Sequence, residues 1–122
     1  MSRVQEFTEY RQRMNARIHE TGTTTTKRFF ALDERCYQDG AVDARTKELA
    51  GLSASLVLRC DDCISYHVAQ AVDAGCSREE IMEIFDVGLI VGGSIVIPHM
   101  RRAFQAWDDL QNDTTDDTRL PD

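Results

Sequence analysis

The sequence lacks an uninterrupted apolar run long enough to cross a membrane. Its longest apolar stretch, residues 84–98, is broken by Asp86, by three glycines and by Ser94. This stretch is also shorter than the ~20 residues that a membrane-spanning helix needs. The first residues contain no apolar core of the kind found in signal peptides. We therefore expect a cytoplasmic protein that does not interact with a membrane.

Basic residues are also scarce, with 14 Lys and Arg against 21 Asp and Glu, which gives a formal charge of −7. Residues 108–122 hold six acids and one base, so −6 + 1 = −5 of this charge belongs to the C-terminal segment. The rest is nearly balanced, and nothing in it indicates a nucleic-acid partner. A chain of 122 residues is long enough for one domain. We interpret residues 1–111 as that domain and residues 112–122 as an acidic, disordered tail.

No segment shows the alternation of apolar and polar residues that is typical of a β-strand. Apolar residues instead recur at steps of three and four, and residues suited to helix caps fall between these segments. The pattern predicts an all-α, single-domain bundle of about six helices. The first expected helix ends near Gly22, and the second follows the threonines at 23–26 and ends at Gly40. The third begins after Asp43, and the fourth runs from about Asp61 to Ala74. The fifth follows a Ser77–Glu80 capping box, and the last runs from Ser94 or Pro98 to Leu110.

Two of the four cysteines lie in the sequence Cys60-Asp-Asp-Cys63, with His67 four residues further on. Residues four apart share one face of a helix, so His67 can accept the Cys63 proton. Cys60 falls near the helix start, where backbone N–H groups favour an anion. Two cysteines at this spacing can also close a small disulfide ring. In a reducing cytosol, such a pair indicates catalysis, redox sensing or metal binding.

Zinc is the metal to consider, with Cys36, Cys76 or His99 as a further ligand. The second ligand pair of common zinc motifs is missing, so we expect no metal and no other cofactor. Cys36 and Cys76 have no base at helical spacing, and we interpret both as small apolar fillers. His99 is interpreted as a helix-terminal or surface residue.

Glu48 lies upstream with eleven residues before Cys60, and this spacing of Glu48, Cys60, Cys63 and His67 resembles the signature of the alkylhydroperoxidase D and carboxymuconolactone decarboxylase superfamily. The flanking residues 74–83 and the later glycine pair are also similar, so that the resemblance covers about residues 43–100. It implies an all-helical subunit in a ring-like homo-oligomer, a hexamer or trimer. It also implies that Cys60 and Cys63 cycle between dithiol and disulfide, and that Glu48 and His67 form a proton relay.

The activity implied by the resemblance is reduction of an organic hydroperoxide, or of a partner's disulfide, with a thiol, lipoyl or thioredoxin-like electron donor. Because His67 is near Cys63, we expect Cys63 to attack and Cys60 to resolve the sulfenic acid. The opposite order stays open, because Cys60 is better placed at the helix start. Two other hypotheses remain: a carboxymuconolactone decarboxylase-type lyase that uses His67 and Glu48 as acid and base, and a non-catalytic redox-sensing oligomer.

Two structural expectations follow from these assignments. In a simple antiparallel hairpin, Glu48 and His67 would be offset by roughly 6 Å along the axis, at 1.5 Å per residue. A bridging water or a helix crossing would then be needed to join them. Residues 84–97 are apolar around nearly the whole helix, which predicts that neighbouring subunits cover part of this surface.

Overall fold

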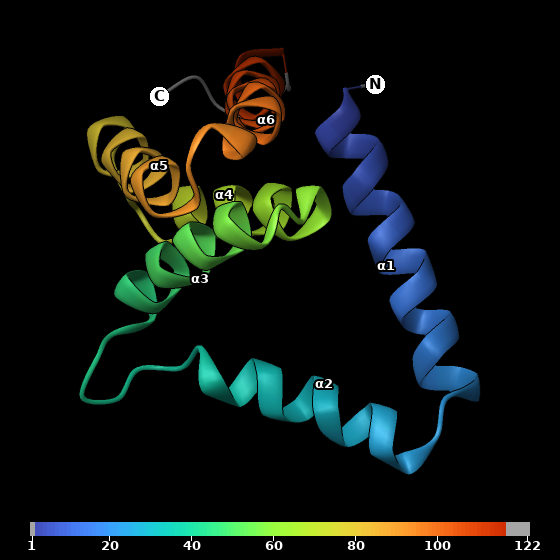
Figure 1. Ribbon diagram of the computed structural model, residues 1–122. Helices are drawn as coiled ribbons and strands as arrows, with labels where there is room; N and C mark the ends of the chain where they lie inside the picture. The colour runs from blue at the N-terminus through green and yellow to red at the C-terminus, as the bar shows by residue number, and fades with distance from the viewer. Residues whose placement is uncertain (1, 117–122) are drawn as a thin grey trace.

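The computed structural model describes residues 2–116, and these residues form six α-helices and one short 3₁₀ helix without any strand (Figure 1). The predicted all-α fold is confirmed. The helices are α1 (Arg3–Thr21), α2 (Thr24–Cys36), α3 (Ala44–Leu58), α4 (Asp61–Asp73), α5 (Arg78–Gly92), η1 (Ser94–Val96) and α6 (Ile97–Asp116).

Several helix starts lie where the capping residues predict them. The Asp43 side chain accepts the Thr46 N–H at 2.8 Å and so begins α3. At the start of α5, Ser77 and Glu80 each accept the other's backbone N–H, which is the reciprocal arrangement of a capping box. These side chains satisfy N–H groups that have no partner inside the helix.

The second helix is shorter than expected, because α2 ends at Cys36 and not at Gly40. The Gly40 N–H donates to the Val42 carbonyl at 3.0 Å, in a turn that leads the chain into α3. Gly40 therefore belongs to the connection and does not terminate the helix.

The last helix is longer than expected, since α6 continues past Leu110 to Asp116. No glycine or proline lies between these two residues, so the backbone meets no helix breaker there. Residues 112–116, which the sequence pattern placed in the tail, are thus helical. Residues 117–122 lie outside the described residues.

Four helices, α3 to α6, form the core of the molecule (Figure 1), in which α3 packs against α4 and α5, and α4 packs against α6. An ideal Cβ built on Gly88 of α5 would lie 2.9 Å from the Leu56 side chain, so this glycine allows α5 to approach α3 closely. Each large apolar side chain that becomes buried contributes about 1.5–3 kcal/mol. The largest fully buried side chains are Phe85, Leu52, Leu56, Ile64, Ile81, Val68 and Val96.

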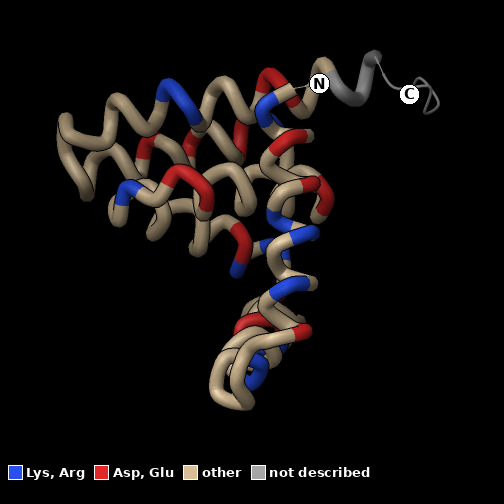
Figure 2. Tube along the Cα trace, turned by 90° about the vertical axis from the view of Figure 1, so that its right-hand side faces the viewer, with Lys and Arg blue, Asp and Glu red and all other residues tan. Residues whose placement is uncertain are grey.

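The first two helices form an arm, defined here as α1 and α2, that projects from the core (Figures 1 and 2). Helix α1 contacts α4 and α6, and it also contacts α2. No residue of α2 is fully buried, and Phe29 and Leu32 of this helix are 69% and 65% exposed. Acidic and basic residues are interspersed along both the core and the arm (Figure 2). Within the described residues, none of the helices has the length and apolar character needed to cross a membrane.

Candidate functional site

The two cysteines of the motif lie at the start of α4 and are joined in a disulfide, with their Cα atoms 5.2 Å apart. Cys60 is the N-cap residue, and its Sγ accepts the Cys63 backbone N–H at 3.3 Å. The cysteine sulfur therefore occupies the position in which a serine or aspartate oxygen commonly caps a helix. The Cys60 sulfur thus belongs both to the helix cap and to the disulfide, and the disulfide lies at the first turn of α4.

His67 and Glu48 are paired directly, with the imidazole Nδ1 2.8 Å from the Glu48 Oε1. Both residues are 8% exposed. An ionised carboxylate only accepts hydrogen bonds, so the Nδ1 carries the hydrogen and donates it. The two side chains span the predicted axial offset by direct contact. This pairing fixes the tautomer of His67 and leaves its Nε2 as the nitrogen with a lone pair in the neutral ring.

Two tyrosines flank the imidazole, and the sequence pattern did not predict either of them. The ring centroids of Tyr37 and Tyr66 lie 5.4 Å and 5.3 Å from that of His67. The Tyr37 hydroxyl is 3.4 Å from Nε2. Burial raises the pKa of both phenols, with the Glu48 charge adding to the effect at Tyr37. Tyr66 was recognisable as the chain neighbour of His67, whereas Tyr37 directly follows α2, thirty residues away.

A cavity of about 340 Å³ lies against Cys63 and His67. Its apolar wall is made by Phe7, Tyr10 and Met14, which all come from α1. Cys63 is exposed there, whereas Cys60 is less accessible because it is half-buried. The cavity therefore gives a small molecule access to the second cysteine of the motif. The remaining lining residues are Arg11, Asn15, Asp33, Asp62 and Tyr66.

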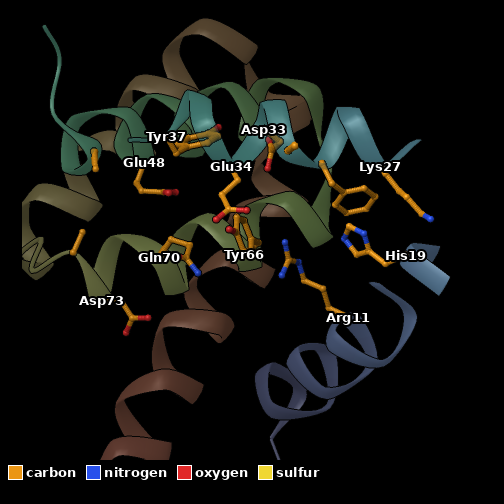
Figure 3. Close-up of a pocket in the computed structure, with 14 residues that line it drawn as sticks. Arg11, His19, Lys27, Asp33, Glu34, Tyr37, Glu48, Tyr66, Gln70 and Asp73 are labelled. Atoms are coloured by element: carbon orange, nitrogen blue, oxygen red, sulfur yellow. The ribbon is translucent and has the colours of Figure 1, made fainter. Parts of the chain in front are cut away.

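A second cavity, of about 710 Å³, lies between the arm and helices α3 and α4 (Figure 3). Glu48 and Tyr37 line this larger cavity, whereas Cys60 and Cys63 do not. Arg11 points from α1 toward Tyr66 (Figure 3), with its guanidinium carbon 4.0 Å from the ring centroid. Arg11 and Tyr66 line both cavities, and this cation–π contact is where the two meet.

His99 lies in the first turn of α6, as a helix-terminal residue, but its side chain is only 19% exposed. Its Nδ1 is 2.7 Å from Asp61 Oδ1, and Arg102 donates to the other oxygen of this carboxylate at 2.9 Å. Because Asp61 lies between the two cysteines, this contact ties α6 to the redox turn. The sequence provided no signal for it, since the partners are 38 and 41 residues apart.

The other two cysteines are free and lie apart from the disulfide. Cys76 is buried as expected, and burial raises the pKa of its thiol. Cys36 is exposed, so its interpretation as an apolar filler was wrong. It ends α2, which buries no residue fully, and there is no core at that position for it to fill. Within the described part of the chain, no group of three His, Cys, Asp or Glu residues is arranged to hold a metal ion.

Comparisons with known proteins agree with this geometry. A crystal structure from Thermotoga maritima superposes with a TM-score of 0.88 at 50% sequence identity and covers 92% of this chain and 98% of that chain. A second crystal structure from the same organism has a TM-score of 0.86 at 50% identity and covers 91% and 94% of the two chains. It is described as a carboxymuconolactone decarboxylase family protein with a suggested involvement in the antioxidative response.

Among curated sequences, an uncharacterised protein of the cox locus of Paracoccus denitrificans is 32% identical over 89 residues, which cover 73% of this chain and 80% of that protein. The model of the carboxymuconolactone decarboxylase family matches residues 24–109. This match spans the second half of the arm and nearly all of the core, including the disulfide and the relay. The chain therefore belongs to the carboxymuconolactone decarboxylase family.

Proposed function

We propose that this protein is a thiol-disulfide oxidoreductase that reduces an organic hydroperoxide, or the disulfide of a partner, through a Cys60–Cys63 dithiol and disulfide cycle. The observation that carries the proposal is a disulfide at a helix start whose second cysteine shares a cavity with a buried, carboxylate-paired histidine. The suggested antioxidative role of the Thermotoga maritima relative supports the same direction.

Atoms and electrons balance in the peroxidase cycle. The Cys63 thiol gives its proton to His67, and the thiolate attacks the terminal peroxide oxygen, so that an S–O bond forms as the O–O bond breaks. The alkoxide takes the proton back and leaves as an alcohol. Cys60 then displaces hydroxide from the Cys63 sulfenic acid, which yields the disulfide and, with the Cys60 proton, water. A dithiol donor restores both thiols and is itself oxidised to a disulfide.

Exposure favours Cys63 as the attacking thiol. Cys63 is exposed in the smaller cavity, whereas Cys60 is half-buried and its sulfur caps the helix. The apolar side chains from α1 favour a hydroperoxide with an organic body over hydrogen peroxide, because they provide a surface on which such a body loses its hydration. The electron donor in this proposal is a dithiol, since one donor molecule then completes the exchange.

Peptide mapping after a stoichiometric dose of cumene hydroperoxide tests this function. We expect the reduced protein to form the Cys60–Cys63 bond as its main product, while Cys36 and Cys76 stay alkylatable after unfolding. The two-residue spacing holds the motif thiols at high effective concentration, and burial keeps the Cys76 thiol protonated. With excess dithiol, hydroperoxide consumption should continue over many turnovers.

Two other results would point elsewhere. A main product that contains Cys36 or Cys76 would overturn the assignment of the redox pair. A Cys60→Ser/Cys63→Ser variant that still converts a carboxylated lactone would favour acid–base catalysis by His67 and Glu48. Oxidation of the pair without turnover would indicate a redox sensor.

A further inference from the structure

In the disulfide state, both nitrogens of the His67 ring have a partner. Nδ1 is bonded to Glu48 at 2.8 Å, and Nε2 faces the Tyr37 hydroxyl at 3.4 Å. Nε2 is the atom that must accept the Cys63 proton in the proposed cycle, because Nδ1 is already engaged. The tyrosine therefore contacts the one atom on which the acid–base step depends.

Gly51 of α3 provides the space for this contact. An ideal Cβ at position 51 would lie 2.7 Å from the Tyr37 oxygen and 2.8 Å and 2.9 Å from the His67 Cε1 and Nε2 atoms. Glycine is unfavourable inside a helix, so a glycine at this position of α3 needs a packing reason. The simultaneous approach of the hydroxyl and the imidazole is that reason.

The direction of the hydrogen bond follows from the surroundings of the phenol. Burial, followed by the nearby Glu48 charge, raises the pKa of Tyr37 above its usual value of 10.0. The phenol therefore keeps its proton at neutral pH and can donate it. In a neutral ring that gives its Nδ1 hydrogen to Glu48, Nε2 is the acceptor of this bond.

We propose that Tyr37 is a positioning residue for His67: its hydroxyl holds the Nε2 atom in place while Cys63 is in the disulfide, and it stays beside that atom during the proton transfer that follows reduction. Gly51 is the residue that makes this arrangement possible. The inference deepens the proposed function and rests on it.

A single proton moves in this step. After reduction, it passes from the Cys63 sulfur to Nε2, which leaves a thiolate and an imidazolium. The new Nε2–H then has two acceptors within the site, the thiolate and the Tyr37 oxygen. For the latter contact the Tyr37 O–H rotates toward the 710 Å³ cavity, which Tyr37 lines. The tyrosine therefore changes from donor to acceptor without losing its proton.

The test measures how fast Cys63 reacts with iodoacetamide in the reduced, full-length protein, across pH values below and above the free-thiol pKa of about 8.5. We expect Tyr37→Phe to react about 3- to 10-fold more slowly near neutral pH, on the order of one neutral hydrogen bond. The deficit should disappear above the free-thiol pKa, since the base is then no longer needed. A purely structural defect would persist at every pH.

Tyr66→Phe is the matched control, because it removes the hydroxyl of the other tyrosine beside the same ring. That hydroxyl interacts with Arg11 and not with His67, so any effect of this change should be the same at every pH. Gly51→Ala should slow the reaction near neutral pH, because its Cβ would push the Tyr37 hydroxyl and the His67 ring apart, and the thermal midpoint measured alongside reports what this overpacking costs in stability. The double variant should lose less than the product of the two single losses, since both changes act on one contact.

The outcomes separate the inference from the proposed function. If His67→Ala slows Cys63 near neutral pH while Tyr37→Phe matches the wild type, the role of Tyr37 is wrong and the oxidoreductase proposal stands. If His67→Ala has no effect, the relay fails and the role of Tyr37 fails with it. If the alkylation rate of the double variant fell by the full product of the two single losses, Tyr37→Phe and Gly51→Ala would act independently. That result would also contradict the shared contact.

Discussion

His67, the base of the proposed cycle, has surroundings that leave its side chain little freedom. The imidazole of His67 is held by Glu48 at one nitrogen and is flanked by two tyrosine rings. A carboxylate that orients a base in this way is typical of sites with an activated nucleophile. In the proposed cycle, the buried pair supplies both the base and the group that orients it.

Removal of the base should make Cys63 a slower nucleophile near neutral pH. General acid–base catalysis contributes 10²–10⁴-fold, so we expect His67→Ala to slow alkylation of Cys63 by roughly 10². Glu48→Gln should slow alkylation of Cys63 by a smaller factor, because Glu48 acts on the histidine and not on the thiol. Both deficits should shrink as the pH rises past about 8.5, where a free thiol ionises without help. Alkylation rates measured across this range provide the check.

Cys60→Ser distinguishes the two thiols in the same assay. With the resolving thiol removed, oxidation should stop at a Cys63 sulfenic acid that dimedone traps. If Cys60→Ser is inert to peroxide while His67→Ala reacts at the wild-type rate, then Cys60 is the attacking residue and the proposed order is reversed.

The residues that the sequence identified are those at fixed spacing within neighbouring helices. Cys63 and His67 are one helical turn apart, so their shared position follows from periodicity alone. The contact between His67 and Glu48 was inferred from the family resemblance, because a helix hairpin by itself suggested an offset. Tyr37 and the Arg102 contact were not predictable, since they depend on how the arm and α6 pack against α4.

At the scale of elements, one ion pair links the starts of α3 and α5. Arg45 is bonded to Glu80, and this contact holds the Glu80 pKa at about 2, well below its usual value of 4.5. The carboxylate also accepts the Ser77 N–H at 2.7 Å, in the capping box of α5. The same side chain therefore caps one helix and ties it to another.

This pKa predicts how stability depends on pH. A carboxyl group whose folded pKa is depressed contributes stability that is fully present above about 4.5 and is lost as the pH falls toward 2. We expect Glu80→Gln, which retains a capping side chain, to unfold at lower urea than the wild type at neutral pH. The gap between the two should close between about pH 4.5 and 2.

The neighbouring Glu79 provides the control, because it is exposed and lies in the same first turn. Urea midpoints measured at each pH should show a much smaller gap for Glu79→Gln. Equal gaps for the two variants would mean that the helix dipole, and not the pairing with Arg45, is responsible.

Helix boundaries show the same division between local and tertiary causes. The starts at Asp43 and Ser77 follow from capping side chains that act within one turn, and they were predictable. The early end of α2 at Cys36 was not, because it is set by the turn that brings Tyr37 to the relay. Tertiary contacts decided the boundary where local signals were weak.

At the scale of the whole molecule, an apolar surface remains uncovered where α3 ends and α5 passes into η1. Ile90, Leu58 and Val91 are 83%, 76% and 68% exposed, and Ile95 is 55% exposed. An apolar surface of this kind marks an interaction site in soluble proteins. We propose that a second copy of the chain covers it, in agreement with the apolar character of residues 84–97.

Light scattering at micromolar concentration should therefore return a mass that is a multiple of 13.8 kDa. Ile90→Asp should shift the mass toward a single chain while the far-ultraviolet circular dichroism stays helical, because the side chain is exposed and not part of the core. Glu79→Gln, a substitution of an exposed acid elsewhere on the molecule, serves as the control. A wild-type mass of one chain throughout this range would contradict the assembly.

The link between α3 and α4 is only two residues long, and it contains the one non-glycine residue with positive φ among those described, Arg59, at φ 57°. The next residue, Cys60, donates its N–H back to the Ser55 carbonyl at 3.1 Å. Each residue added to a helix rotates the downstream chain by about 100° and advances it 1.5 Å. An insertion here would turn His67 away from Glu48 while every residue of the proposed site remained in the sequence. The length of the link is therefore as tightly constrained as the identity of Cys60 within it.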